Sequence, residues 1–266
     1  MAALPEAVDL DADILNRTPS GWPLATKPPV LTCSLGPERR LYRFRQGAHG
    51  TETGNVLWPA SRLLSRYVEQ HCSDFSGRSV LELGAGCALA GVTAAACGAR
   101  VVLTDREAVG KTLTLYNCEA ALLTGFPAPG SLSVSILDWC DHDTWLREHG
   151  VCWDWVLVAD CVYHQQHDYT HLLALAQLLS ALIHQPQPPR VLFSSQERDP
   201  VARHAFFGAL ASHHLSVSTR SLCQLQDEGL DIGIGQHTST ELWWVTADRT
   251  LVAAPAEEIR VIIMSS

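Results

Sequence analysis

The sequence feature that most constrains the fold is an alternation of short apolar runs with longer helical stretches, beginning at residue 79. The short runs, rich in valine and leucine, are predicted strands: Val80–Leu83, Val101–Leu103, Leu132–Leu137, Trp155–Ala159 and Val191–Ser194. The stretches between them have helical spacing: Ala88–Cys97, Ala108–Leu123, Asp143–His149 and His167–His184. Strands that alternate with helices in this way predict an α/β fold with a mostly parallel sheet and helices on both faces.

The flanking segments extend this pattern on both sides. Val30–Leu35 and Arg40–Arg45 surround a Gly-Pro-Glu turn and predict a hairpin, and Trp58–Cys72 has helical periodicity. Later in the chain we expect a helix at Pro200–Ala211 and strands at Leu215–Thr219 and Glu241–Ala247. We therefore expect a mobile or draped arm at 1–27, one domain at 28–249 with its core at 54–247, and a C-terminal extension at 250–266.

Composition excludes several classes of protein. Of 266 residues, 47% are hydrophobic and 18% are charged, which indicates a packed core rather than a disordered chain. The 28 acidic residues against 19 basic ones give a net charge of −9, and a phosphate backbone repels a chain of that sign. We expect no nucleic-acid partner.

Neither a membrane span nor a secretory leader is expected. The longest uncharged apolar run, Leu172–Ile183, is too short to cross a hydrocarbon layer of about 30 Å, and the acidic first residues differ from a secretory signal. The nine cysteines form no C-x-x-C pair, which favours reduced thiols over a disulfide framework or a zinc ribbon. These features favour a cytoplasmic location, with the nucleus as an alternative.

A glycine turn follows the first strand of the alternation. Val80–Leu83 is followed by Gly84-Ala85-Gly86 and then by a helix. The glycines let a ligand approach the main chain closely, and the start of the helix offers it free N–H groups. This arrangement suits a nucleotide-like ligand. A dinucleotide fingerprint would need Gly or Ala where Leu89 stands, and Gly91 comes two residues late, so a nicotinamide-dependent oxidoreductase is disfavoured.

Asp105 ends the next strand, 21 positions after Gly84. An acid at this separation commonly accepts hydrogen bonds from both hydroxyls of a ribose. The alternative is a turn or helix-cap residue, as an aspartate after a strand often is. No metal site is expected, because none of the twelve histidines belongs to a complete ligand set. The sequence contains no G-x-S-x-G nucleophile elbow, so a hydrolase is not indicated.

At this point the sequence resembles the seven-strand S-adenosylmethionine-dependent methyltransferases. The closer resemblance is to protein lysine methyltransferases related to those that modify chaperones and elongation factors. It covers residues 50–247 and depends on four segments: 54–60 (GNVLWPA), 81–86 (LELGAG), 137–139 (LDW) and 159–163 (ADCVY). The resemblance implies the Rossmann-like seven-strand methyltransferase fold and S-adenosylmethionine as cofactor.

The resemblance also implies roles at the cofactor. Glu82, Gly84 and Gly86 would line its methionine and ribose part, with Ala159 nearby, and Asp105 would hold the ribose hydroxyls. Further along the cofactor, Asp138 would accept from the adenine amino group and Trp139 would pack on the ring. For Trp139 the alternative is a residue that fills the core.

The remaining implied roles concern the acceptor. Trp58 would cover the cofactor beside the sulfonium, and Asp160 and Tyr163 would face the substrate entrance as the catalytic residues. A helix-start contact for Trp58 and a helix cap for Asp160 are the alternatives. The hairpin and the helix after it are expected to help form the cofactor lid. Ser194–Arg198 resembles a strand end and arginine near the cleft of relatives, but no role follows for it.

Methyl transfer is an in-line attack on a carbon bound to cationic sulfur, so alignment and a suitable field are the main requirements. A lysine amine is neutral only about once in 2,500 molecules at pH 7. Asp160 favours the ammonium form and is therefore assigned to capturing and orienting the cation, with proton loss to water.

The expected partner is a protein carrying the acceptor lysine, such as a chaperone or translation factor, and the expected state is a monomer. Histidine, arginine or a small amine are alternative acceptors. A non-catalytic adaptor on the same scaffold is a further alternative.

Overall fold

The computed structural model describes residues 8–9, 30–46, 56–150, 152–163, 168–196, 198–221, 224–225 and 240–248. The C-terminal extension and all but two residues of the N-terminal arm lie outside these ranges, as do His164 and His167. Where the arm is described, Val8–Asp9 forms strand β1, which pairs in parallel with the first strand of the hairpin.

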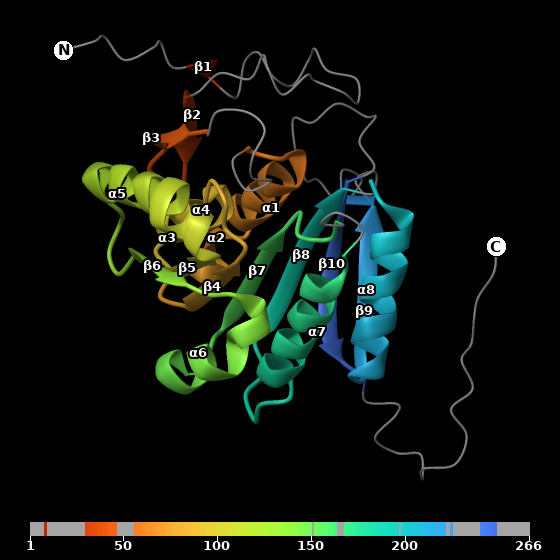
Figure 1. The fold of residues 1–266 in the computed structure, drawn as a ribbon. Coiled ribbons are helices and arrows are strands. Elements are labelled where there is room, and N and C mark those ends of the chain that lie inside the picture. The colour runs from red at the N-terminus through yellow and green to blue at the C-terminus, as the bar shows by residue number, and fades with distance from the viewer. Residues whose placement is uncertain are drawn as a thin grey trace, which may run out of the picture.

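A seven-stranded sheet forms the centre of the domain (Figure 1). Its strands are β4 (Ser79–Leu83), β5 (Arg100–Asp105), β6 (Ser131–Ile136), β7 (Trp155–Ala159), β8 (Arg190–Gln196), β9 (Leu215–Ser221) and β10 (Thr240–Ala247). The order is β6-β5-β4-β7-β8-β10-β9, and β10 runs antiparallel to both of its neighbours, while the other pairs are parallel. The prediction of a mostly parallel α/β sheet is confirmed.

Helices cover both faces of the sheet. One face carries α6 (His142–His149), α7 (Thr170–Ile183) and α8 (Pro200–Ser212), which lie together in Figure 1. The other carries α1 (Pro59–Gln70), the short α2 (Cys72–Phe75) and α3 (Leu89–Ala96). The two-residue period of a strand produces this division: in β7, Trp155 and Leu157 join the core on the α3 side, while Val156 and Val158 join the α7 side.

Helix α3 is buried along its whole length because its residues are small. All eight are buried, and five are Ala or Gly, so α1 and the sheet approach it closely. Ser65 of α1 and Thr93 of α3 share a buried hydrogen bond between their hydroxyls at 2.7 Å, which satisfies both polar groups inside the core. This bond joins the middle of α3 to α1.

The predicted helix at Ala108–Leu123 is interrupted in the structure. It consists of α4 (Glu107–Val109), a π-helical turn η3 (Gly110–Thr114) and α5 (Leu115–Thr124). Gly110 explains the difference, since a Cβ there would lie 2.7 Å from Ile136 Cδ1 and 3.2 Å from the Asp105 carbonyl oxygen. The helix passes so close to the ends of β5 and β6 that the wider turn occurs at this contact.

The hairpin consists of β2 (Val30–Leu35) and β3 (Arg40–Arg45), with the predicted bounds. It packs against α5, where the Tyr42 hydroxyl donates to the Gly125 carbonyl at 2.8 Å. A 3₁₀ turn, η4 (Trp139–Asp141), follows β6. No helix in the described part of the chain is long and apolar enough to cross a membrane.

The strand order reverses between β4 and β7. From β4 the chain first adds β5 and β6 on one side, and then β7 and β8 on the other. In open sheets of this type, ligands bind past the carboxyl ends of the strands at such a reversal. The glycine turn after β4 and Asp160 after β7 flank this point.

Candidate functional site

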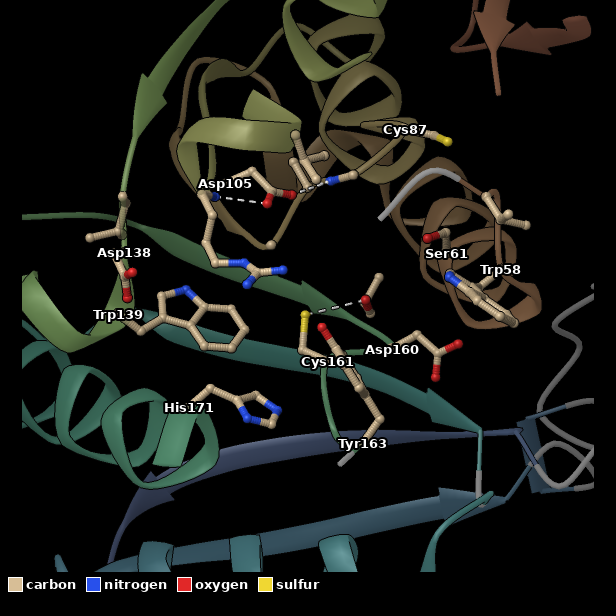
Figure 2. Close-up of a pocket in the computed structure, with 18 of the residues that line it drawn as sticks. Trp58, Ser61, Cys87, Asp105, Asp138, Trp139, Asp160, Cys161, Tyr163 and His171 are labelled. Atoms are coloured by element: carbon tan, nitrogen blue, oxygen red, sulfur yellow. Dashed lines mark hydrogen bonds between the residues drawn. The ribbon is translucent and has the colours of Figure 1, made fainter. Parts of the chain in front are cut away.

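A cavity of about 310 Å³ lies at the carboxyl ends of the parallel strands. Figure 2 shows Asp138 and Trp139 on one side of this pocket, Trp58 and Asp160 on the other, and Cys161 and Tyr163 between them. Nine of the ten residues predicted for the site line the cavity: Trp58, Gly84, Gly86, Asp105, Asp138, Trp139, Ala159, Asp160 and Tyr163. The structure thus brings together residues from five separate sequence segments, and their individual roles stay predictions.

The glycine turn needs its two bare residues. Gly84 has a φ of +66° and Gly86 a φ of +51°, which is backbone that residues with a Cβ rarely adopt. A Cβ on Gly84 would also lie 2.7 Å from Cys161 Sγ and 3.2 Å from Trp139 Cζ2. The turn is therefore packed between the two halves of the pocket as well as open to it.

Two residues that the sequence analysis missed fasten this turn. The Thr114 hydroxyl of η3 donates to the Gly86 carbonyl at 2.8 Å, and the Asn117 amide donates to the Cys87 carbonyl at 3.1 Å. Asn117 also exchanges hydrogen bonds with the backbone of Arg45 at the end of the hairpin. The signal in the sequence was a polar residue on an otherwise apolar helix face. It does not identify the hydrogen-bond partner, because that backbone lies about 30 residues away in sequence.

Asp105 is oriented by backbone donors. Its Oδ2 accepts from the Gly86 N–H at 2.7 Å and its Oδ1 from the Arg106 N–H at 2.8 Å. The side chain is buried, so these charge-assisted bonds fix the carboxylate at the edge of the cavity. Each carboxylate oxygen has two lone pairs, and a carboxylate held in this way can also accept from ligand hydroxyls.

Glu82 is the predicted site residue that does not line the cavity, which corrects its expected place. It is buried beneath the turn, where its Oε2 accepts from the Gly91 N–H at 2.9 Å. Burial, reinforced by the charge of Asp105 and opposed by the Gly91 bond, raises the pKa of Glu82 to about 8. Gly91 makes room for it, since a Cβ there would lie 2.4 Å from Oε2. Glu82 supports the pocket from below through its bond to the Gly91 N–H near the start of α3.

Asp138 and Trp139 lie at the far side of the pocket. Asp138 is the N-cap of η4 and its Oδ1 accepts from the Cys140 N–H at 2.9 Å. The Trp139 ring is stacked on His171, with ring centroids 6.3 Å apart and planes inclined by 21°. Although Trp139 contacts the core, its ring also lines the cavity, so it is more than a residue that fills the interior.

Asp160 has an unusual backbone and a buried carboxylate. Its φ is +58°, its side chain has no exposed surface, and its Oδ1 accepts from the Gln196 N–H at 3.3 Å. Its Oδ2 lies 2.6 Å from a guanidinium nitrogen of Arg198. The helix-cap alternative finds no support among the described contacts, since Asp168 is the carboxylate that accepts from the first turn of α7.

Arg198 also contacts Trp58. Its guanidinium carbon lies 4.3 Å from the centre of the indole ring, which is a cation–π contact. Trp58 is the N-cap residue of α1 but makes no side-chain cap, and Pro59 follows it as the first helical residue. Trp58, Asp160 and Arg198, from three distant segments, thus form one cluster on the wall of the pocket.

Tyr163 and His171 complete this part of the wall, with ring centroids 5.2 Å apart. Burial lowers the pKa of His171, partly opposed by its bond to the Tyr163 backbone and the charge of Asp168, so the imidazole is neutral at neutral pH. Its Nε2 is buried and finds no hydrogen-bond partner in the described structure. The sequence pattern gave no sign that His171 would reach the pocket.

Cys161 is protected from reaction by its surroundings. Burial first, and then the negative charges of Asp105 and Asp160, raise the pKa of its thiol well above the usual value. The thiol donates to the carbonyls of Ala159 at 3.4 Å and Leu83 at 3.6 Å. Because the thiolate is the nucleophilic form, this cysteine is inert at neutral pH.

The hairpin contributes no described residue to the cavity lining, and its expected part in a lid stays a prediction. The α1 start does contribute, through Val56, Trp58 and Ser61. Within the described ranges, no group of three or more His, Cys, Asp and Glu side chains is placed to hold a metal. The eight cysteines that the structure describes are free thiols.

Comparison with known families identifies one match along most of the domain. The family described as "Lysine methyltransferase" matches residues 41–213, which contain the glycine turn and all ten predicted site residues.

Curated relatives match shorter stretches. The protein N-lysine methyltransferase METTL21A of Danio rerio is 35% identical over 111 residues, which is 42% of this chain and 49% of that protein. The histone-arginine methyltransferase METTL23 of Homo sapiens is 30% identical over 123 residues, which is 46% of this chain and 62% of that protein. The chain spans about half the length of the curated relatives it matches.

Solved structures share the fold. The SAM-dependent methyltransferase from Agrobacterium tumefaciens has a TM-score of 0.53 at 15% identity, covering 79% of this chain and 68% of that one. SMU.776, solved as a complex with SAH, has a TM-score of 0.52 at 14% identity, covering 82% of this chain and 56% of that one. At these identities the likeness shows the arrangement of helices and strands.

Proposed function

Because the chain belongs to the lysine methyltransferase family, we propose that it transfers a methyl group from S-adenosylmethionine to a lysine side chain of a partner protein. The observation that carries the proposal is the pocket at the strand-order reversal. Its lining includes the glycine turn, which packs against Cys161 and Trp139. Asp138 lies on one side of the pocket, and Trp58 and Asp160 lie on the other (Figure 2).

The residues of the pocket fit this cofactor. Gly84 and Gly86 leave the backbone bare for close approach, and Asp105 is oriented to accept from the two hydroxyls of a ribose. Asp138 suits an amino group and Trp139 the face of a purine ring. When bound, S-adenosylmethionine supplies a methyl group activated by attachment to cationic sulfur.

The chain's own contribution is alignment of the acceptor. Trp58, Asp160 and Tyr163 line the acceptor end, and the bulk of these side chains restricts the approach of water and of the amine. Asp160 is not placed as a free base, because its Oδ2 is paired with Arg198, so the lysine proton leaves to water. No metal enters this scheme.

Substrate class and cellular location belong to the same proposal. A chaperone or a translation factor is the proposed kind of partner, on the resemblance of the sequence segments 54–60 and 159–163 to enzymes that modify such proteins. The reduced thiols support a cytosolic or nuclear site of action, and we propose that the protein acts as a monomer. Its relative METTL23 is named for arginine, which makes arginine the second candidate acceptor.

A labelling experiment tests the function. The purified chain is incubated with methyl-labelled S-adenosylmethionine and cell extract, and mass spectrometry identifies each labelled protein and residue. We expect label on lysine; label on arginine or histidine would transfer the proposal to that acceptor. Calorimetry with S-adenosylmethionine and its demethylated product is the parallel measurement, and absence of binding to both would reject the function.

A further inference from the structure

Arg198 occupies the place where the acceptor's charge would be expected to bind. Its guanidinium pairs with Asp160 at 2.6 Å and lies 4.3 Å above Trp58, so it lies between two of the residues predicted for the acceptor end. The Arg198 side chain is 30% exposed, and the Asp160 side chain is fully buried. A carboxylate in this state has its charge largely neutralised by its partner.

The backbone around Arg198 is anchored on both sides. Before it, the Gln196 N–H at the end of β8 donates to Asp160. After it, Asp199 caps α8, accepting from the Val201 N–H at 3.1 Å and the Ala202 N–H at 3.0 Å. These bonds hold the backbone next to Arg198, while the side chain itself is held by Asp160 and Trp58.

The charged and titratable groups at this end of the pocket come from several elements. Asp160 follows β7, Arg198 and Asp199 lie between β8 and α8, and Tyr163 and the neutral His171 come from the β7–α7 connection and α7. A further cation of the cavity lining, Arg106 after β5, acts on His171 and lowers its pKa. Asp199 is bound to the N-terminus of α8, whose dipole compensates its charge. Arg198 is therefore the group that decides whether the Asp160 carboxylate is available to a second cation.

We propose that Arg198 is a specificity-determining residue of the acceptor site: it withholds Asp160 from charged ligands, so that the site takes an amine in its neutral, nucleophilic form. The inference rests on the proposed function and deepens it. It replaces the role first expected for Asp160, the capture of an ammonium ion, with that of anchoring Arg198 against Trp58.

This arrangement discriminates between acceptors by their ability to lose a proton. A lysine ammonium becomes neutral by releasing one proton to water, and its lone pair can then form the new N–C bond. A guanidinium keeps its charge at any pH a protein tolerates, so Arg198 repels it, and the Asp160 carboxylate is already paired with Arg198. The site therefore favours lysine over arginine.

A binding experiment on the cofactor-free protein tests the inference independently of transfer. The probe is n-butylamine, which has the charge and length of a lysine side chain and is protonated at pH 7.5. We expect Arg198→Gln to bind it at least about tenfold more tightly than the parent, because Asp160 becomes available. Adding Asp160→Asn to Arg198→Gln is expected to remove the gain.

Arg203→Gln is the matched control. Arg203 also pairs with a carboxylate, Glu241 at 2.9 Å, and lies over the rings of Phe207 and Trp243, but it does not line the cavity. We expect this variant to bind n-butylamine as the parent does. Equal affinity of the parent and Arg198→Gln would overturn the inference; should Arg198→Gln not fold, Arg198→Met, whose apolar stem can pack on Trp58, gives the same comparison.

The pH dependence of kcat gives the second readout, with the labelled protein as acceptor. In Arg198→Gln the acceptor is expected to bind more tightly in its unreactive ammonium form, so KM falls. The bound amine then loses its proton at higher pH, and the apparent pKa of the acid limb of kcat is expected to rise by about one pH unit. Arg198→Lys keeps the charge and is expected to leave the limb in place. Coinciding profiles for the parent and Arg198→Gln would reject the inference alone; absence of labelling by the parent would reject the proposed function together with it.

Discussion

At the cofactor end of the pocket, carboxylates are held by backbone N–H groups, whereas at the acceptor end the carboxylate is held by one backbone N–H group and also by a side-chain cation. Asp105 bonds to Gly86 and Arg106, and Asp138 bonds to Cys140, two residues further on. Asp160 accepts from the Gln196 N–H and in addition pairs with Arg198, 38 positions away. Backbone donors orient a carboxylate and leave its negative charge for a ligand, while a guanidinium cancels that charge. The carboxylates at the cofactor end therefore keep their charge for hydrogen-bond donors of a ligand, whereas the Asp160 carboxylate at the acceptor end is already paired.

The largest expected effect separates the two ends directly. Asp160→Ala removes the anchor of Arg198 and leaves its guanidinium unbalanced beside the acceptor. We expect transfer to fall by at least about 100-fold, while the Kd for the cofactor stays within about tenfold, because the bonds of Asp105 and Asp138 are untouched. Radiolabel transfer and calorimetry measure the two quantities. Asp143→Ala, on a side chain that is 79% exposed, is the control; a cofactor Kd that weakens as much as transfer would contradict the division into two ends.

Gly84→Ala tests the turn that joins the ends. The added Cβ would meet Cys161 Sγ at 2.7 Å on backbone with a φ of +66°. We expect the cofactor to bind about 100-fold more weakly and Tm to fall by several degrees, since such strain costs about 1–3 kcal/mol.

The matched glycine for this test is Gly208 in α8, where a Cβ would meet nothing within 4 Å. Gly208→Ala should leave cofactor binding unchanged and keep or raise Tm, because alanine favours the helix. Equal behaviour of the two variants would show that the turn tolerates a side chain.

Asp105→Ala sharpens the account of the cofactor end. It removes the acceptor for the Gly86 and Arg106 N–H groups and for the ribose hydroxyls, so we expect the cofactor Kd to rise by about 10- to 100-fold. Asp105→Asn keeps one acceptor oxygen but loses the charge, so its Kd for the cofactor is expected to lie between those of Asp105→Ala and the parent. A thermal-shift titration in which Asp105→Ala binds as tightly as the parent would remove Asp105 from its role.

The smallest effect concerns Glu82, which acts beneath the turn. Its pKa in the folded protein is about 8, above the usual value of 4.5, so the folded state binds more protons than the unfolded one between these values. The free energy of unfolding therefore falls as pH rises from 4.5 to 8. Glu82→Gln cannot ionise and lacks this loss. We therefore expect the Tm of Glu82→Gln minus the Tm of the parent, both measured without cofactor, to increase as pH rises from 5 to 8. A constant difference in Tm would show that Glu82 has an ordinary pKa.

The cofactor end could be predicted from the sequence because its geometry is local. Gly84 and Gly86 signal a turn by residue type, and Asp105 and Asp138 each follow a predicted strand, so the parallel sheet brings them to one edge. The exception is Glu82. It belongs to the same sequence motif as the glycine turn, but its side chain points beneath the turn toward Gly91.

The acceptor end could be predicted only in part. Asp160 and Tyr163 belong to a recognisable sequence segment. Arg198 also resembles an arginine of relatives, but the sequence does not reveal which residues it contacts. The left-handed backbone at Asp160, the stacking on Trp58 and the buried Nε2 of His171 depend on where separate segments meet.

The sequence by itself determined the order of strands and helices, the bare turn and the acids at the strand ends, because hydrophobic period and residue type act over a few neighbouring positions. The tertiary structure decided which charges remain available to a ligand. That outcome depends on pairs such as Asp160 with Arg198, whose energies arise only when the folded sheet brings distant side chains within a few ångströms and excludes water from between them.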